Sequence, residues 1–253
     1  ENYTYGELFN EINANTGGIN CGVEVFDRAD STEEFQAMFS VRGKALYTKM
    51  DFLFKMIGEI LNSSKLEDTK RLYEIVASVK SRAQVNLTGA GHSTAVLRAA
   101  AYSSPMAAFQ DEMAGIGYYQ FIEKLEKDFE QRKEETVEEL CKLMKKILRP
   151  ENFMISYTGE RESLETVQKL AGAVKAGLGT EPVEKSEEKL TCTKKNEGFK
   201  TSGQVQYVAQ TGNFKKKGLE YTGALEILKV ILSYDYLWMN LRVKGGAYGC
   251  MSS

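Results

Sequence analysis

The segment RVKGGAYGC, residues 242–250, carries the two side chains of this sequence that are best suited to chemistry. Arg242 provides a planar cation and Tyr248 a phenolic hydroxyl, and a Gly-Gly pair lies between them. Held a few ångströms apart, these groups could hydrogen-bond a peptide carbonyl and the oxyanion that it becomes. The alternative is purely structural: an arginine near the negative end of a helix dipole, a Gly-Gly helix stop and a packed tyrosine. Spacing alone favours this alternative and does not settle the choice.

Other candidate sites are weaker. His92, in TGAGHSTA, is the only histidine, so this chain alone cannot form a two-histidine metal site, and a surface or capping role is favoured. The same stretch contains a GxG, but it lacks a third glycine and a GK[ST] and follows a helical pattern, which disfavours a nucleotide loop. Acids and lysines are interspersed over residues 123–139, which is typical of a solvated helix face.

Composition limits the classes of partner. Of the 253 residues 42% are hydrophobic and 27% charged, and the net charge of −2 gives no basic excess for a nucleic-acid backbone. The longest apolar runs, such as residues 227–232, fall short of the ~20 residues that a membrane span needs. The four cysteines include no CxxC pair, so free thiols are favoured over a zinc site or redox couple. We expect neither nucleic acid nor membrane as a partner.

The first part of the chain has clear periodicity. Apolar residues between positions 5 and 12 share one helical face, and Gly17-Gly18 follows as a helix stop. Residues 19–25 and 35–41 alternate between apolar and polar side chains, which predicts two antiparallel strands. From Lys44 the spacing becomes helical and continues to Leu148, with breaks near residues 89–91 and 103–105.

The second part is less regular. Residues 153–157 predict a short strand, followed by a helix that ends at Gly177 and Gly179. Residues 180–200 are charged and show no clear period, so we place a linker there. Beyond the linker, residues 205–209 predict a strand, and residues 225–239 predict a helix that is apolar all round and therefore buried on two faces.

The two ends of the chain are similar to each other. TGGINCG at residues 16–22 and KGGAYGC at residues 244–250 each follow a helical pattern, stop at Gly-Gly and turn into a strand. This similarity is what a duplicated αβ unit would leave, with the second copy cut short. We therefore expect an α+β fold with a mainly antiparallel sheet and helices packed on one face. Strands at 205–209 and 247–250 would have open edges, so we expect them to pair with the first unit or with a second copy of the chain.

RVKGGAYG, preceded by YDYLWMNL, resembles the insulinase and pitrilysin-type zinc metallopeptidases, the M16 inverzincin family, and most closely their presequence-protease-like branch. The opening YGELFNEINANTGGI resembles a segment in the third homologous domain of those proteins. NFMISYTGE and the helix after it resemble the end of that domain. The resemblance spans essentially the whole chain, with two specific ends and a helical middle that is only compatible.

The resemblance implies a particular architecture and activity. Members have four related αβ domains of the LuxS/metallopeptidase-like roll type, which form two halves around a chamber that admits unfolded peptides. Zinc lies in the first domain, held by an H-x-x-E-H helix and a downstream glutamate. An arginine and a tyrosine of the last domain bind the substrate backbone across the chamber, and by match to the motif these are Arg242 and Tyr248 here.

This sequence contains no H-x-x-E-H, so the resemblance places zinc and the general base in an N-terminal catalytic half outside this chain. Residues 1–178 then correspond to the third domain without its first elements, residues 179–200 to a linker, and residues 201–253 to a truncated start of the fourth. We expect the chain to be a C-terminal-half fragment of a peptidase that degrades unfolded peptides, inactive and free of zinc by itself. The expected compartment is the bacterial cytoplasm, or an organelle matrix if the source is eukaryotic.

Two alternatives stay open at this point. The parent protein could be a non-catalytic scaffold or core-subunit relative of the same fold, in which Arg242 and Tyr248 persist as packing residues. The chain could also be an independent peptide-binding module. An H-x-x-E-H with a downstream glutamate, encoded upstream of Glu1, would favour the peptidase over both.

Overall fold

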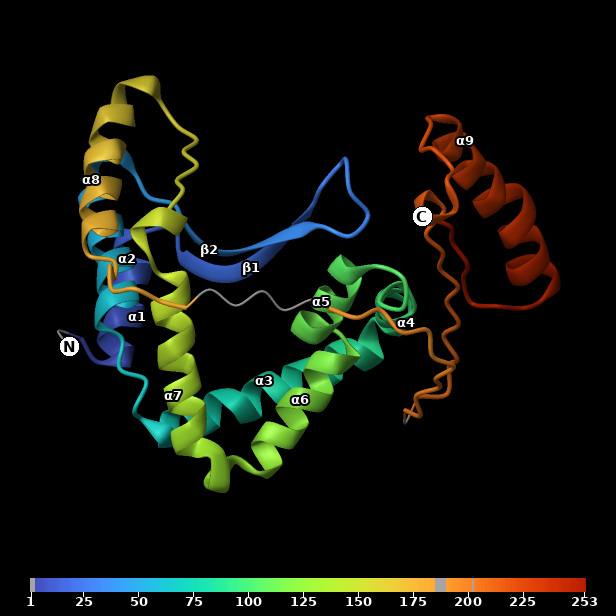
Figure 1. The fold of residues 1–253 in the computed structure, drawn as a ribbon, viewed down its shortest axis with the longest axis horizontal. Coiled ribbons are helices and arrows are strands. Elements are labelled where there is room, and N and C mark those ends of the chain that lie inside the picture. The colour runs from blue at the N-terminus through green and yellow to red at the C-terminus, as the bar shows by residue number, and fades with distance from the viewer. Residues whose placement is uncertain (1–2, 185–189, 202) are drawn as a thin grey trace. The chain divides into compact units, whose positions relative to one another are not determined.

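A computed structural model describes residues 3–184, 190–201 and 203–253 of the chain (Figure 1). The described residues form helices and one two-stranded antiparallel sheet, so the predicted α+β class is confirmed. The chain divides into two compact units, Glu1–Gln210 and Thr211–Ser253. This division lies beyond the linker expected at residues 179–200, and the assignment of homologous domains stays a prediction.

Helix α1 (Tyr5–Asn15) begins and ends as its sequence predicts. The Thr4 hydroxyl accepts a hydrogen bond from the Glu7 backbone N–H at 3.3 Å, and the Glu7 carboxylate accepts one from the Thr4 N–H at 2.8 Å. This reciprocal capping box satisfies two N–H groups that a helix start leaves without partners. After α1, Gly18 adopts a φ of 108°, a left-handed conformation that glycine reaches without strain, and the chain turns into a strand.

Strands β1 (Ile19–Asp27) and β2 (Phe35–Gly43) pair antiparallel over their full length, in a register that sets Ile19 opposite Gly43 and Asp27 opposite Phe35. The alternation in the sequence predicted both strands and their pairing. At the hairpin turn, the Arg28 guanidinium binds the carboxylates of Asp30 and Glu34 at 2.9 and 2.8 Å. The hairpin is thereby closed at its tip by charge-assisted hydrogen bonds.

Helices occupy most of residues 50–147, and a further one lies at residues 164–176. They are α2 (Met50–Ser63), α3 (Thr69–Gly89), α4 (Gly91–Ala100), α5 (Pro105–Ala114), α6 (Ile116–Lys127), α7 (Phe129–Ile147) and α8 (Leu164–Ala176). Short 3₁₀ turns occur at Tyr47–Lys49, Pro150–Asn152, Arg161–Ser163 and Lys215–Lys217. The breaks at residues 89–91 and 103–105 were predicted. At the second break Ser104 caps α5 and Pro105 is its first residue, where a missing N–H costs nothing.

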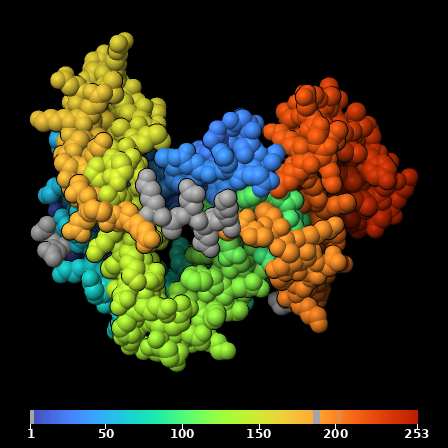
Figure 2. All heavy atoms as spheres, in the orientation of Figure 1, coloured from blue at the N-terminus to red at the C-terminus, as the bar shows by residue number. Residues whose placement is uncertain are grey.

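The core of Glu1–Gln210 lies between α3, α6 and α7. Val76, Ile122, Leu125 and Phe129 form one buried cluster, and the Tyr73 ring lies 5.3 Å from the Phe129 ring. A second set of buried side chains is contributed by α2 and α8, which pack on each other. Figure 2 shows the outer surfaces of α6 and α7, in green and yellow-green, which carry mainly the polar side chains of these helices.

Three of the predicted strands do not form. Residues 153–157, 205–209 and 247–250 are without strand pairing, and the only strands among the described residues are β1 and β2. A strand is stabilised by hydrogen bonds to a neighbour, and among the described residues β1 and β2 pair only with each other, so each keeps an open outer edge. The expected pairing of residues 205–209 with strands of their own unit is therefore wrong. Pairing of residues 247–250 with the first unit or with a second copy stays a prediction.

The last helix is also more exposed than predicted. Helix α9 (Ala224–Ile231) continues directly into η5 (Leu232–Lys244), whose backbone is π-helical, and none of their described residues is buried. Ile227 and Val230 are 65% and 54% exposed, so the expected burial on two faces is wrong for this chain. Thr211–Ser253 contains too few other residues to cover a helix that is apolar all round. No helix in the described part of the chain is long and apolar enough to cross a membrane.

The core assignment can be tested at Phe129, which is 2% exposed. Phe129→Ala should lower the free energy of unfolding by about 3 to 5 kcal/mol, because it removes a buried ring and leaves a cavity. Phe121→Ala on α6 is the matched control, since Phe121 is 53% exposed. Urea denaturation should separate the two variants clearly. Equal losses would contradict the placement of the core between α3, α6 and α7.

Candidate functional site

Arg242 lies in the last turn of η5, and its guanidinium has contacts on two sides. One terminal nitrogen donates a hydrogen bond to the Ala247 carbonyl at 3.2 Å. On the helix side, the guanidinium carbon lies 5.8 Å from the centre of the Trp238 ring, within cation–π range. The arginine is therefore tied both to the helix that precedes the Gly-Gly pair and to the segment that follows it.

The Gly-Gly pair sets the geometry of this turn. A Cβ at Gly245 would lie 2.7 Å from the Leu241 carbonyl oxygen, so the position has no room for a side chain. Gly246 has a φ of 72°, in the left-handed region that favours glycine. The chain then reverses, and the Ala247 N–H donates to the Leu241 carbonyl at 3.0 Å. Arg242 and Tyr248 thus lie on either side of a turn whose backbone is fixed.

Tyr248 does not pack within Thr211–Ser253. It is 92% exposed, the highest value among the large hydrophobic side chains that are exposed in the described residues. The structural alternative for this segment required a helix-terminal arginine, a Gly-Gly stop and a packed tyrosine. The first two are present and the third is not, so packing within Thr211–Ser253 does not account for the tyrosine.

His92 and the charged residues of α7, which were the other candidates in the sequence, lie where a surface role would place them. His92 is exposed at the start of α4, and its ring lies 6.3 Å from the Tyr207 ring. The charges of α7 form ion pairs three residues apart, among them Arg132 with Glu135 and Lys133 with Glu130, as a solvated face does. Within the described ranges no three histidine, cysteine or acidic residues lie together as metal ligands would. These residues do not offer the donor set that a catalytic zinc ion needs.

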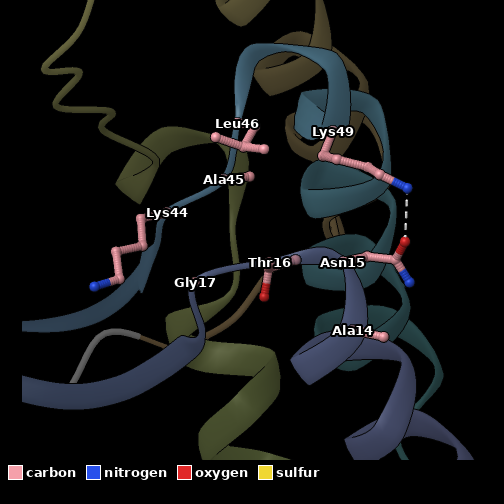
Figure 3. A pocket seen from close by; sticks show the side chains of 8 residues that line it. All are labelled: Ala14, Asn15, Thr16, Gly17, Lys44, Ala45, Leu46 and Lys49. Carbon is pink, nitrogen blue, oxygen red and sulfur yellow. Dashed lines mark hydrogen bonds between the residues drawn. The ribbon is translucent and has the colours of Figure 1, made fainter.

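A cleft of about 420 Å³ lies where α1 ends and β2 leads into α2 (Figure 3). Its lining residues are Ala14, Asn15, Thr16, Gly17, Lys44, Ala45, Leu46 and Lys49. Backbone hydrogen bonds between Gly17 and Lys44 at 2.7 Å and between Lys44 and Gly18 at 3.3 Å hold the two walls together. On one side the Lys49 ammonium donates to the Asn15 side-chain oxygen at 2.8 Å.

This cleft was missed in the sequence, because its two walls come from segments about thirty residues apart that only the fold brings together. Its lining contains two lysines but no carboxylate, histidine or thiol. The Thr16 hydroxyl donates to the Ile12 carbonyl at 2.7 Å, and the lining contains no carboxylate or histidine that could activate Thr16 or the lysines, so we assign no chemistry to it.

Comparisons with known proteins agree with the resemblance carried by the two ends. A family model for the region associated with peptidases of the M16 family, subfamily C, matches residues 1–125. Over all its 253 residues the chain is 36% identical to "Protein HypA" of Clostridium perfringens and covers 26% of that protein. It is 27% identical to "Presequence protease 1, chloroplastic/mitochondrial" of Arabidopsis thaliana, with 97% of this chain and 23% of the relative aligned. For "Presequence protease, mitochondrial" of Yarrowia lipolytica the identity is 28%, over 97% of this chain and 25% of the relative. The chain spans about a quarter of the length of these relatives.

The turn between Arg242 and Tyr248 can be tested at Gly246. Gly246→Ala should weaken the end of η5 by about 1 to 2 kcal/mol, because an alanine pays a steric penalty in the left-handed region. The matched control is Gly249→Ala, since Gly249 has no positive φ and a Cβ there would meet nothing within 4 Å. Amide hydrogen exchange of residues 241–247 measures the effect. Equal exchange in both variants would contradict a turn that depends on Gly246.

Proposed function

This chain belongs to the M16 peptidase family and is presequence-protease-like, and from this we propose that the complete protein is a zinc-dependent endopeptidase that degrades unfolded peptides in a closed chamber. In this proposal the chain supplies contacts to the substrate backbone through Arg242 and Tyr248. Zinc and the general base belong to other parts of the polypeptide. Residues 1–178 form a third homologous αβ domain, and residues 201–253 begin a fourth.

The observation that carries the proposal is the exposure of Tyr248 at the end of a fixed turn. At 92% exposure the phenol has no packing role within Thr211–Ser253, yet the backbone that bears it is held by the Gly-Gly turn. A hydroxyl presented in this way can donate a hydrogen bond to a carbonyl oxygen of a bound peptide. Such a donor accelerates cleavage if its hydrogen bond strengthens as the oxygen gains negative charge.

Arg242 is suited to bind the peptide rather than to react. An arginine has five N–H donors in a planar fork, and the hydrogen bond to Ala247 uses one of them. The contact with Trp238 limits the motion of the side chain, so less conformational entropy is lost when a peptide carbonyl is bound. The expected role is a two-point contact with the substrate backbone beside the group that Tyr248 contacts.

The length comparison supports the proposal that zinc binding and the substrate contacts of Arg242 and Tyr248 belong to different parts of the polypeptide. The chain covers 26% of the Clostridium perfringens relative and 23% of the Arabidopsis thaliana relative, so most of each relative lies outside the aligned part. The described residues do not offer a zinc donor set. A peptidase that uses zinc would therefore take its metal ligands from outside this part of the chain.

Tyr248→Phe in the full-length protein is the direct test. Loss of one oxyanion donor should lower kcat by roughly 10- to 10³-fold while KM changes less. The matched control is Tyr234→Phe, because Tyr234 lies on η5 and is 68% exposed. Zinc content should be equal in all variants. Wild-type kinetics from Tyr248→Phe would remove the catalytic role, and a wild-type protein without peptidase activity would instead favour the scaffold alternative.

Arg242→Lys tests the second residue by a different kinetic parameter. An ammonium is a point charge and cannot reproduce a planar two-point contact, so KM for a peptide substrate should rise more than kcat falls. Arg161→Lys is the matched control, since Arg161 is also exposed and lies in a different part of the chain. A change in kcat with constant KM would contradict a binding role for Arg242.

A further inference from the structure

Arg98, near the end of α4, binds the carboxylates of two separate segments. One terminal nitrogen lies 2.6 Å from an oxygen of Asp111 on α5. The other two nitrogens donate to the two oxygens of Glu197, at 2.8 and 3.1 Å. This is the paired geometry in which an arginine binds a carboxylate most strongly. The Arg98 side chain is 15% exposed, so water competes for these hydrogen bonds only weakly.

Asp111 holds the Arg98 side chain in one position. It is 1% exposed, and its two oxygens accept hydrogen bonds from the backbone N–H groups of Ile116 and Gly117, each at 3.1 Å. These N–H groups belong to the first turn of α6, where a negative charge is also favoured by the helix dipole. A Cβ at Gly117 would lie 2.9 Å from an Asp111 oxygen, so glycine lets the carboxylate approach. The aspartate therefore has one orientation, and Arg98 is held in place by it.

Glu197 belongs to residues 190–201, which form neither helix nor strand. Besides Arg98, the Tyr102 hydroxyl donates to Glu197 at 2.5 Å. The Arg98 guanidinium also lies 5.7 Å from the Phe199 ring and 5.9 Å from the Tyr102 ring. Figure 1 shows this segment, in orange, passing beside α5 and α4, and Figure 2 shows its atoms against the green atoms of these helices. An irregular segment is thus attached to the helices by one carboxylate and one ring.

We propose that Arg98, Tyr102, Asp111 and Glu197 form a clasp that holds residues 190–201 on α4 and α5. The clasp fixes the point from which the chain runs on to Thr211–Ser253, the unit that carries Arg242 and Tyr248. Only residues 198–210 then separate the anchored glutamate from that unit. Arg98 and Glu197 are positioning residues in this proposal, which does not depend on the peptidase role of the complete protein.

The electrostatics make the clasp a constant attachment rather than a pH switch. Hydrogen bonds from Arg98 and then from Tyr102 lower the pKa of Glu197 from 4.5 to about 2. Lys195, 3.9 Å away, is a second cation, so the carboxylates of Glu197 and of Asp111 on α5 together face two positive charges. Because the folded pKa lies below the unfolded one, this stabilisation is complete above about pH 5 and is lost as pH falls through the folded value. The clasp therefore stays charged near neutral pH.

The test is limited trypsin digestion of the full-length protein, with cleavage after Lys195 and Lys200 followed by mass spectrometry. Arg98→Lys leaves the cleaved segment unchanged and keeps a positive charge for Asp111, but it cannot form the paired contact with Glu197. Cleavage at these two sites should become roughly 3- to 10-fold faster, because proteolysis tracks the population of the detached segment. The matched control is Arg132→Lys, which alters an exposed ion pair on α7 and should leave the rate unchanged.

Two further variants keep the proposal falsifiable if Arg98→Lys loosens the whole protein. Tyr102→Phe removes only the phenolic hydrogen bond, and Glu197→Gln removes the charge while the Arg98–Asp111 pair stays intact. Because glutamate lies close to the cleavage sites, the Glu197→Gln rate is normalised to synthetic peptides of residues 190–201 with either residue. Faster cleavage in both variants, with other sites unaffected, supports the clasp. Rates within twofold of wild type for both variants would overturn it.

Discussion

Burial between α3, α6 and α7 is the interaction on which the described structure depends. Val76, Ile122, Leu125 and Phe129 exclude water from one continuous seam, and α2 and α8 form a second packed pair in the same unit. The ion pair between Lys80 and Glu126, 2.6 Å apart, spans α3 and α6 beside this seam. Hydrophobic burial is the largest favourable term in folding, and polar contacts add specificity to an arrangement that burial already stabilises. The clasp is an example of such added polar contacts, because it joins an irregular segment to helices that belong to the same packed unit.

Thr211–Ser253 is organised by a different kind of constraint. None of the described residues of α9 and η5 is buried, so packing does not set the geometry around Arg242 and Tyr248. Backbone sterics set it instead: Gly245 has no room for a side chain, and Gly246 adopts a conformation that other residues avoid. A turn fixed by its own backbone keeps its shape even where the surrounding surface is exposed. This is what a side chain that must contact a separate molecule requires, since its position does not depend on being covered.

Sequence reasoning succeeded where structure is decided by neighbours in the chain, and failed where it needs distant partners. The helical face of α1, its glycine stop, the alternation of β1 and β2 and the break before Pro105 all follow from local rules. Residues 153–157 are a short apolar run and residues 205–209 alternate, but neither pattern supplies a hydrogen-bonding partner. The contact between Arg98 and Glu197 joins residues 99 positions apart, and neither belongs to a motif that would single it out. For the candidate site, the Gly-Gly turn was predictable, whereas the exposure of Tyr248 was not.

The two Gly-Gly segments show that local sequence can end a helix without deciding whether a strand forms after it. At both ends the second glycine has a positive φ, 108° at Gly18 and 72° at Gly246, so the similarity in sequence corresponds to a similarity in backbone. After Gly18 the chain becomes β1, because β2 lies alongside it and exchanges hydrogen bonds from Ile19 to Asp27. After Gly246 no described segment takes the place of β2, and residues 247–250 stay unpaired. The local sequence therefore determines that the helix ends and in which direction the chain leaves it. Whether the next residues form a strand depends on a partner, so residues 247–250 would form one only where another segment offers a free edge.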